Sequence, residues 1–559
     1  MTVGLFASPL EEVVIPNADI PTFFFERVEQ NSGFVHGDAP RAVFVSEDGG
    51  ESLSLAQLRE LAGRLAAGLY HDVGVRRGDV VAVVLPNSVY YMPVVLAALM
   101  LGAQCTLANP AYTARELRHQ LEDSGARHVV ADAARCGAVC EAVGQGAAQQ
   151  RISQVLVVDR VAPGAAAAAA AGVPVRSVFD VLRDGGFPRV ALRTEAECAQ
   201  TPALILYSSG TTGAPKGVLL SHRNLVACAL QVMALQRSNS PAGMPPGTGT
   251  GMAILPLFHT FGFAFQCMAM PLRGLTTVVV PRFDMQRFLA AVQAHRVTET
   301  VMVPPIINAL VKLPAGATRE KYDLSSVATI TVGAAPLGAE IIAMLEALMP
   351  HVCVLQGYGM TEASPVLSVN MRATRNIASS GPLAPNMEAK VVDDDGRMLA
   401  AGEVGELCFR GPNVMLGYLN RPEDTAATVD ADGFLHTGDI GYIGEGCHVF
   451  VTDRKKELIK FSGFQVAPAE LEALLMQHSR VADCAVARAF DEGRQTEVPR
   501  AYLVLDPGVA PEARDKTAQA VVEWLNAQVA YYKQLRGGYV LLDSIPKSAA
   551  GKILRRMLA

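Results

Sequence analysis

The sequence has no long run of basic residues and no large excess of either charge. Its 559 residues include 48 Lys and Arg against 54 Asp and Glu, which gives a formal net charge of −6. Nucleic-acid-binding surfaces carry clustered positive charge, so this composition predicts no nucleic-acid partner. Half of the residues are hydrophobic and 18% are charged, a balance typical of folded globular chains and not of disordered ones.

No hydrophobic stretch is long enough to cross a bilayer, which takes about 20 helical residues. The longest one, Met92 to Ala103, predicts a buried helix instead. The N-terminal segment MTVGLFASPLEEVV has neither a basic start nor a long apolar core, so a signal peptide is not expected. The final residues Arg-Met-Leu-Ala differ from a peroxisomal Ser-Lys-Leu address. We therefore expect a cytoplasmic protein with no transmembrane segment.

The ten cysteines include no Cys-x-x-Cys pair. Cys136 and Cys140 lie four residues apart, but no second pair or histidine cluster completes a zinc site. Free thiols in a reducing compartment, buried or partly exposed, are the simpler interpretation.

The sequence does contain an alternation of helix and strand patterns. Apolar residues at helical spacing run from Leu53 to Val73, and the β-branched run DVVAVVLPNS follows. A helix from Tyr90 to Leu101 and a strand from Ala103 to Ala108 come next. Further buried-strand candidates are HVVADA, QVLVVD, TTVVVP, ETVMVPP and VATITVG. This alternation predicts an α/β fold with mostly parallel sheets flanked by helices.

The length of the chain predicts two or more domains, since 559 residues exceed one hydrophobic core. After about Gly381, short strands joined by Asp-Gly or Gly turns predict a β subdomain. An earlier run of seven alanines, Ala165 to Ala171, lies between Gly and Pro and is interpreted as a surface insertion without a function.

The pattern of predicted elements changes again near Asp453, where a small mobile α+β lid domain is expected to begin. Its predicted elements are a helix at 468–477, strands at 482–488 and 500–505, and a helix at 513–529. We therefore divide the chain into a large N-terminal domain (1–452), a hinge (453–456) and a C-terminal domain (457–559).

The most informative stretch is LILYSSGTTGAPKGVLLSHRN, residues 204–224. A buried strand, Leu204 to Tyr207, leads into small residues whose backbone N–H groups can turn inward on one anion. The candidate phosphate-binding residues are Ser208, Ser209, Gly210, Thr211, Thr212 and Lys216. A Walker loop would need Ser or Thr after the lysine, and Gly217 stands there instead. The competing interpretation, a merely flexible loop, is disfavoured by the unbroken Ser-Ser-Gly-Thr-Thr-Gly run.

SSGTTGAPKGV resembles the signature loop of the adenylate-forming superfamily, which includes acyl-CoA synthetases, 4-coumarate–CoA ligases, firefly luciferase and nonribosomal adenylation domains. Further signatures occur in the family's order: QGYGMTEASP (356–365), HTGD (436–439), DRKKELIKFSGFQVAPAELE (453–472) and PKSAAGKILRRML (546–558). The likeness covers nearly the whole chain.

The resemblance implies a two-step reaction with ATP, Mg²⁺ and coenzyme A. A carboxylate is a poor electrophile because its leaving group would be oxide, and a mixed anhydride with AMP supplies a better one. The acyl group would then pass to the thiol of coenzyme A. We expect an acid–CoA ligase of the 4-coumarate–CoA ligase-like group, acting as a monomer or homodimer.

The resemblance also implies roles for residues in the first half-reaction. Thr361 would contact the α-phosphate, and Glu362 would bind magnesium, which prefers hard oxygen ligands. The positions expected around the adenine and ribose are Ala334, Gln356, Gly357, Tyr358, Asp439 and Arg454. Lys552 would reach the carboxylate and the α-phosphate, although a lone lysine there would normally be solvated surface.

For the second half-reaction the family rotates its C-terminal domain, and this chain matches the residues involved. Lys456 matches the hinge position. The loop expected to reach the site after rotation contains Lys460, Ser462, Gly463 and Gln465. Many 4-coumarate ligases carry a lysine where this chain has Ser462, which leaves that coenzyme A contact open. Arg282 matches a basic position that can meet a phosphate of coenzyme A, and an exposed charge after a strand is the equal alternative.

The identity of the acid stays open between a hydroxycinnamate and a medium- or long-chain fatty acid. His259 in LPLFHTFGF matches a family histidine near the carboxylate, with a core histidine as the alternative. Plant 4-coumarate ligases commonly have tyrosine where this chain has Phe261, which cannot donate a hydrogen bond. Other functions compatible with the motifs are loading of a carrier protein, a luciferase-type oxygenase and nucleotide binding without catalysis.

Overall fold

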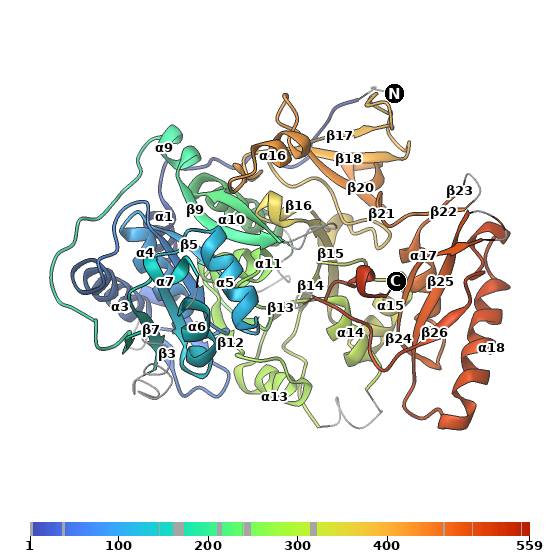
Figure 1. The fold of residues 1–559 in the computed structure, drawn as a ribbon, viewed down its shortest axis with the longest axis horizontal. Coiled ribbons are helices and arrows are strands. Elements are labelled where there is room, and N and C mark those ends of the chain that lie inside the picture. The colour runs from blue at the N-terminus through green and yellow to red at the C-terminus, as the bar shows by residue number, and fades with distance from the viewer. Residues whose placement is uncertain are drawn as a thin grey trace.

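A computed structural model describes most of the chain as a large α/β body with a smaller domain at its C-terminal end (Figure 1). The described residues are 4–35, 40–144, 146–159, 173–208, 215–237, 239, 247–313, 321–461, 464–492, 494, 496–548 and 551–558. The alanine run at 165–171 lies outside them.

The first large sheet has the strand order β19-β10-β9-β5-β4-β6-β7-β8. Its strands are β4 (Val80–Val84), β5 (Gln104–Leu107), β6 (His128–Asp132), β7 (Val155–Val158), β8 (Val175–Ser177), β9 (Pro202–Ser208), β10 (Lys216–Ser221) and β19 (Gly417–Tyr418). The pairs from β9 to β8 are parallel, whereas β10 runs antiparallel to both β9 and β19. The buried strands predicted from β-branched runs are confirmed here.

The second large sheet has the order β16-β15-β14-β13-β11-β12-β2-β3. Its strands are β2 (Phe44–Ser46), β3 (Ser52–Leu53), β11 (Thr250–Ala253), β12 (Thr276–Val279), β13 (Glu299–Met302), β14 (Thr329–Val332), β15 (Cys353–Gly359) and β16 (Val366–Val369). The pairs from β2 to β15 are parallel, and antiparallel strands close both edges. The predicted fold class, α/β with mostly parallel sheets, is confirmed.

Helices cover the two large sheets and separate them from each other and from solvent. They are α1 (Ile20–Glu29), α2 (Ser32–Val35), α3 (Leu55–Gly68), α4 (Tyr91–Met100), α5 (Ala114–Asp123), α6 (Cys136–Val143), α7 (Ala148–Arg151), α9 (Glu195–Gln200), α10 (His222–Arg237), α11 (Thr260–Gly262), α12 (Met270–Leu272), α13 (Met285–His295), α14 (Pro304–Val311) and α15 (Ala339–Leu348). The predicted helix 53–73 is α3 followed by one π-helical turn, Leu69–Val73.

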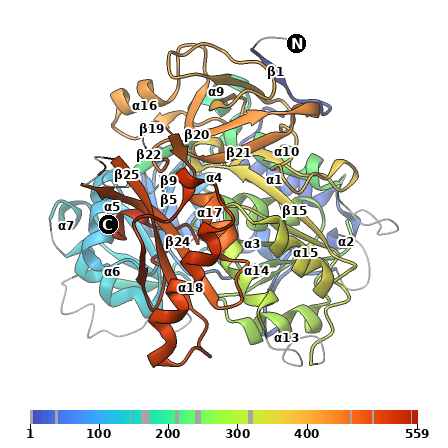
Figure 2. The same cartoon turned by 90° about the vertical axis from the view of Figure 1, so that its right-hand side faces the viewer.

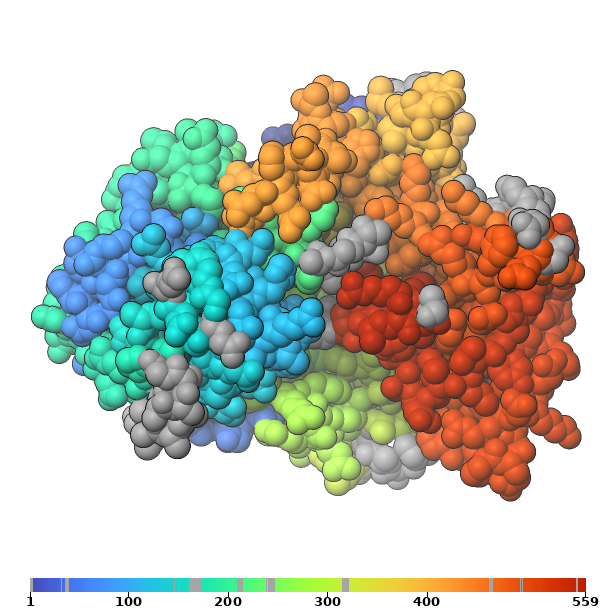
Figure 3. All heavy atoms as spheres, viewed as in Figure 1, coloured from blue at the N-terminus to red at the C-terminus, as the bar shows by residue number. Residues whose placement is uncertain are grey.

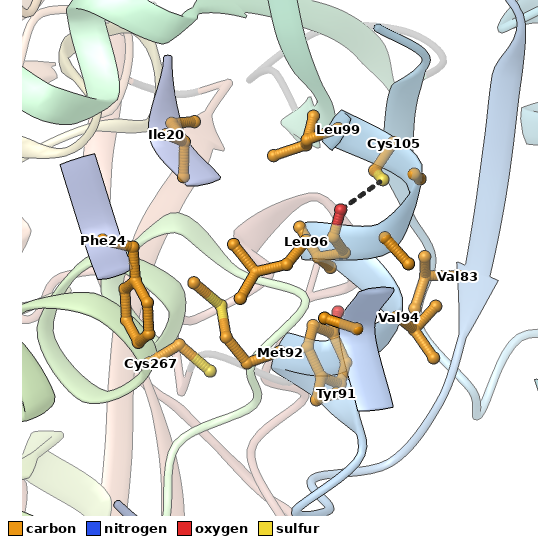
Figure 4. Close-up of a cluster of buried hydrophobic side chains, with 14 of the residues drawn as sticks. Ile20, Phe24, Val83, Tyr91, Met92, Val94, Leu96, Leu99, Cys105 and Cys267 are labelled. Carbon is orange, nitrogen blue, oxygen red and sulfur yellow. Dashed lines mark hydrogen bonds between the residues drawn. The ribbon is translucent and has the colours of Figure 1, made fainter. Parts of the chain in front are cut away.

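The core between the sheets explains the long apolar run of the sequence. Every residue of α4 is buried, so this helix has no polar face. Figure 4 shows Met92 and Leu96 of α4 pointing toward Phe24 of α1 and toward Cys267. The run is therefore a buried helix, as predicted, and no helix among the described residues is long and apolar enough to cross a membrane.

A five-stranded antiparallel sheet forms the predicted β subdomain, in the order β1-β17-β18-β20-β21. Its elements are β1 (Phe6–Ala7), β17 (Glu388–Val392), β18 (Gly405–Arg410), α16 (Pro422–Thr428), β20 (Leu435–Ile443) and β21 (Val449–Arg454). The N-terminal strand β1 thus pairs with a segment almost 400 residues away, and both lie at the top of Figure 1.

The C-terminal domain carries the predicted helix–strand–strand–helix series. Its elements are β22 (Ile459–Phe461), β23 (Phe464–Val466), α17 (Pro468–Leu475), β24 (Val481–Asp491), β25 (Thr496–Leu505), α18 (Arg514–Asn526) and β26 (Tyr539–Leu541). It has its own apolar core, built from β22 to β25, α17 and α18. In Figure 2 this domain faces the viewer and lies in front of the large body.

Candidate functional site

A cavity of about 310 Å³ lies where the large body meets the C-terminal domain. Strand ends and loops of the body supply one wall, namely residues 334–337, 339, 356–359, 377–380, 439, 451, 453 and 454. Residues Glu457, Ala469, Glu472, Lys552, Ile553 and Arg555 supply the other wall. In the space-filling view of Figure 3 the C-terminal segment sits against the body at this junction.

The predicted adenine-binding residues lie together at the carboxyl ends of β14 and β15. Ala334 adopts a left-handed backbone conformation with φ 70°, which turns the chain away from the end of β14. The Gln356 amide oxygen accepts a hydrogen bond from the Leu337 backbone N–H at 3.2 Å, and its amide nitrogen donates to the Ile377 carbonyl at 2.9 Å. Gln356 therefore holds the two backbone segments of this wall at a fixed separation.

A buried carboxylate, Asp439, joins three of the predicted residues. It is 4% exposed and accepts a hydrogen bond from the Tyr358 hydroxyl at 2.5 Å. Its other oxygen lies 3.3 Å from Arg454 Nε, because β20 and β21 pair in a register that puts Asp439 opposite Arg454. Burial raises the pKa of Asp439, and Arg454 opposes this shift. The phenol and the guanidinium thus hold the carboxylate at the cavity wall.

Lys552 enters the same cavity from the C-terminal segment. Its backbone exchanges hydrogen bonds with Ser548, whose N–H donates to the Lys552 carbonyl at 2.7 Å and whose hydroxyl accepts from the Lys552 N–H at 3.2 Å. Burial, together with the charge of Arg454, lowers the pKa of the Lys552 amine to about 8. An ammonium in this position is poorly solvated and available to a phosphate or a carboxylate.

Arg555 fixes the segment that carries Lys552, and no sequence pattern singled it out. Its guanidinium binds both oxygens of Glu472 at 2.6 and 2.7 Å, pairs with Glu457, and donates through Nε to the Val486 carbonyl at 2.9 Å. A buried arginine needs such partners. The available signal was the double arginine of ILRRML, three residues after Lys552.

Glu362, the predicted magnesium ligand, lies beside Ser208, the first residue of the predicted phosphate loop. It is 6% exposed, and its Oε1 accepts hydrogen bonds from the hydroxyls of Ser208 at 3.1 Å and Tyr418 at 2.9 Å. Thr361 begins the short 3-10 helix that contains Glu362. A single carboxylate fits magnesium that is bound mainly through substrate phosphates, since Mg²⁺ uses one or two carboxylates and keeps its waters. Within the described residues no group of three or more His, Cys, Asp or Glu side chains could hold a metal.

Two residues that the sequence reasoning missed hold Lys216. Its ammonium lies 2.9 Å from the Asp424 carboxylate and 5.0 Å from the ring centre of Tyr418. The short strand β19 places Tyr418 beside β10, opposite Val218. The signal was the segment GYLNRPED, which combines an aromatic residue with acidic residues at the start of a helix.

The region predicted to meet the acid is buried and apolar around one histidine. Burial lowers the pKa of His259 to about 4, so the ring is neutral at physiological pH. Its Nε2 finds no hydrogen-bond partner in the part of the chain that the structure describes. Phe261 packs edge-on against Phe265 at 5.0 Å, and a Cβ at Gly333 would lie 3.0 Å from the Phe261 ring. The glycine therefore makes room for this aromatic ring.

The structure does not bring every predicted residue to this cavity. Lys456, Lys460 and Arg282 are exposed and lie outside its lining. Several others fall outside the described part of the chain, namely Ser209, Gly210, Thr211, Thr212, Ser462, Gly463 and the Gln465 side chain. Cys136 and Cys140, whose sulfur atoms lie 3.8 Å apart, are free thiols, like the other cysteines.

Similarity to known proteins defines the class. The family model described as AMP-binding enzyme matches residues 31–419, and the model described as AMP-binding enzyme C-terminal domain matches residues 470–552. The chain belongs to the AMP-binding enzyme family. The predicted membership of the adenylate-forming superfamily is thereby confirmed.

The relatives narrow the class further. The chain is 38% identical to 4-coumarate–CoA ligase 2 of Oryza sativa subsp. japonica, over all of this chain and 95% of the relative. It is 36% identical to 4-coumarate–CoA ligase 3 of Arabidopsis thaliana, over 100% of this chain and 94% of the relative. The chain is thus an enzyme of the acid–thiol ligase class and is 4-coumarate–CoA ligase-like.

Solved structures share the fold along nearly the whole chain. ATP-bound MatB from Rhodopseudomonas palustris superposes with a TM-score of 0.78 at 27% identity, covering 96% of this chain and 97% of that one. O-succinylbenzoate coenzyme A synthetase from Bacillus subtilis, in complex with ATP and magnesium ion, superposes with a TM-score of 0.75 at 26% identity. The match covers 95% of this chain and 98% of that one. An anthranilate CoA ligase superposes with a TM-score of 0.82 over 96% of each chain. Because the two sequences are only 23% identical, this likeness supports the fold alone.

Proposed function

We propose that this protein is an ATP-dependent acid–CoA ligase that works through an acyl-adenylate. In the first step a carboxylate oxygen of the acid attacks the α-phosphorus of ATP, the bond to the β-phosphate breaks, and pyrophosphate leaves. In the second step the sulfur of coenzyme A attacks the acyl carbon, AMP leaves with the electron pair of the broken C–O bond, and the thiol proton is lost to solvent.

The observation that carries this proposal is the meeting of Lys552 with Tyr358, Asp439 and Arg454 in one cavity between the two domains. Asp439 and Arg454 would hold ribose hydroxyls, and the 334–337 and 356–359 segments would enclose the base. The Lys552 ammonium would stabilise the charge that develops between the carboxylate and the α-phosphate. Magnesium at Glu362 would neutralise charge on the departing pyrophosphate.

The second step would require another orientation of the C-terminal domain, since Lys552 would occupy the approach to the reacting carbon. The hinge at 453–456 and the exposed residues Lys456 and Lys460 would serve that orientation, with Ser462, Gly463 and Arg282 as candidate contacts to coenzyme A. His259 and Phe261 would lie near the acid. These roles belong to the proposal, as do a cytoplasmic location and a monomeric or homodimeric state.

The acid is proposed to be a hydroxycinnamate, because the named relatives are 4-coumarate–CoA ligases. The alternative, a medium- or long-chain fatty acid, is favoured by the apolar Phe261–Phe265 pair, which offers no hydrogen-bond donor to a phenol. Either acid leaves the two-step chemistry unchanged.

The test is to incubate the purified protein with Mg-ATP, coenzyme A and a panel that includes 4-coumarate, cinnamate, hexanoate and oleate. AMP and acyl-CoA are measured by mass spectrometry, with Lys552→Ala as the control. Acyl-CoA from one class of acid, reduced at least a hundredfold in Lys552→Ala, is the expected result, since loss of such a charge costs about 3 kcal/mol of barrier. Acyl-adenylate without thioester would contradict the proposal and indicate a carrier protein or oxygen as the second partner.

A further inference from the structure

Helix α14 contacts the C-terminal domain near both of its ends. It spans eight residues, Pro304–Val311, and is therefore about 12 Å long. Near its first turn, Pro305 lies beneath Gly551, where a Cβ would come within 3.2 Å of the Pro305 ring. At its other end, the capping residue Lys312 reaches the start of strand β24.

The contact at Lys312 is a specific polar link between the two domains. Its ammonium donates hydrogen bonds to the backbone carbonyls of Val481 at 2.8 Å and Ala482 at 3.2 Å. Desolvation at the domain boundary lowers the pKa of this amine, while Asp483 and Asp506 act in the opposite direction. A charged donor gives a stronger hydrogen bond than a neutral one.

One of the two contacts is adjacent to the residue that the first half-reaction is proposed to use. Gly551 directly precedes Lys552, and it has φ 79°, a conformation that a side chain rarely adopts. A rigid helix that contacts a domain at two separated points fixes the distance of that domain from the large body. It also restricts rotation of the domain. The orientation that puts Lys552 in the cavity is therefore the one in which both ends of α14 are engaged.

We propose that Lys312 is a positioning residue which holds the C-terminal domain in the orientation for acyl-adenylate formation. The inference rests on the proposed two-step function, in which this contact must break before the acyl group is transferred. Lys312 touches neither substrate nor nucleotide, and acts through the position of Lys552. Removing it should slow the first half-reaction and leave the second one unimpaired.

The first test compares Lys312→Met with wild type in separated half-reactions. Pyrophosphate release in a single turnover measures adenylate formation, and thioester formation from synthetic acyl-AMP and coenzyme A measures transfer. We expect about a fivefold slower first step in Lys312→Met, an unchanged or faster second step, and rescue in Lys312→Arg. The matched control is Lys516→Met, an exposed lysine on α18, which should leave both steps unchanged. An equal loss in both steps, or no loss in the first, would overturn the proposal.

A cross-linking test keeps the proposal falsifiable if Lys312→Met does not fold. Lys312→Cys and Ala482→Cys are combined and joined by a short bis-maleimide; nine of the ten native cysteines are buried and Cys447 is partly exposed. The linked protein should form acyl-adenylate but lose transfer to coenzyme A more than tenfold, relative to the same variant treated with N-ethylmaleimide. Unchanged transfer in the linked protein would overturn the proposal.

These outcomes remain distinct from failure of the proposed function. A wild-type protein that adenylates no acid would refute the ligase, whereas efficient cross-linking of the double-cysteine variant would still report the contact at α14. Failure of the pair to cross-link while wild type remains active would refute the positioning role alone.

Discussion

At the residue scale, sequence motifs predicted the site residues that lie within the motifs themselves. They did not predict the residues whose role depends on contacts with distant segments of the chain. Lys552, Asp439 and Glu362 stand in recognisable motifs. The structure puts Lys552 and Asp439 in the cavity wall and Glu362 in contact with Ser208. Tyr418 and Arg555 act through side-chain contacts between distant segments. Their local sequences signal an aromatic or charged side chain but not its partners. Sequence spacing predicts which residues are neighbours on one element, but not which elements meet.

The lowered pKa of Lys552 predicts a basic limit to adenylate formation. In the proposed reaction the ammonium is the active form. It is present below the pKa of about 8, so the rate should fall as pH rises through that value. The measurement is the second-order rate constant for adenylate formation with limiting Mg-ATP, from pH 6 to 10. This rate constant should fall about tenfold for each pH unit above the pKa of Lys552.

A Lys552→Arg variant provides the control, because a guanidinium stays charged throughout this range. Its rate should be lower overall and flat where the wild type declines. If the decline persists unchanged in Lys552→Arg, another group limits the rate.

At the scale of elements, the alternation of apolar patterns predicted the parallel strands and their helices, and the structure confirms them. It did not predict that β10 runs antiparallel to β9, or that the two-residue strand β19 joins the same sheet from some 200 residues later. Such pairings are decided by packing between distant segments and not by intrinsic preference. The same limit hid the π-helical turn after α3, because its apolar spacing continues that of the helix.

Two glycines in α3 allow a matched test of helix packing. A Cβ at Gly68 would lie 1.7 Å from the Val181 carbonyl oxygen, whereas one at Gly63 meets no atom within 4 Å. Gly68→Ala should lower the free energy of unfolding by about 2 kcal/mol through overpacking. Gly63→Ala should raise it by about 0.5 to 1 kcal/mol, because alanine favours the helix.

Thermal unfolding followed by circular dichroism measures both variants against wild type. A lowered midpoint in Gly68→Ala with an equal or raised one in Gly63→Ala is the expected pair of results. Equal destabilisation by both substitutions would show that the contact between α3 and Val181 is not a tight one.

At the scale of the whole molecule, the cavity exists because two domains meet. The length of the chain and the change in sequence pattern predicted two domains. The sequence did not predict which residues form the interface between them. The relevant contacts, at Pro305 with Gly551 and at Lys312 with Val481, join residues about 170 to 250 positions apart. Arg555 ties the C-terminal segment to Glu472 of α17 and to Glu457, so the segment is fixed to the rest of the C-terminal domain.

This arrangement predicts that Arg555→Lys slows adenylate formation more than transfer from synthetic acyl-AMP. Arg555 uses Nη2 for both oxygens of Glu472, Nη1 for Glu457 and Nε for the Val486 carbonyl. A lysine has one nitrogen and cannot make all of these bonds, so Lys552 should lose its fixed position. We expect about a tenfold loss in the first step, measured as pyrophosphate release.

The neighbouring Arg556→Lys substitution, at an exposed side chain outside the cavity, is the control and should be neutral. Equal effects of the two substitutions would show that Arg555 has no special role in holding Lys552.

The interface between the domains also bears on recombination between related genes, because it allows whole C-terminal domains to be exchanged. The body carries one wall of the cavity as well as His259 and Phe261, while the segment after residue 456 carries Lys552. A crossover at that point would pass on the residues proposed to meet the acid with one parent and Lys552 with the other. Such a hybrid would need to match its parents where they touch, including Pro305 with Gly551, Lys312 with β24, and Asp453 with Ala469. Exchange of whole C-terminal domains should therefore be an easier route to new combinations than gradual change across the cavity.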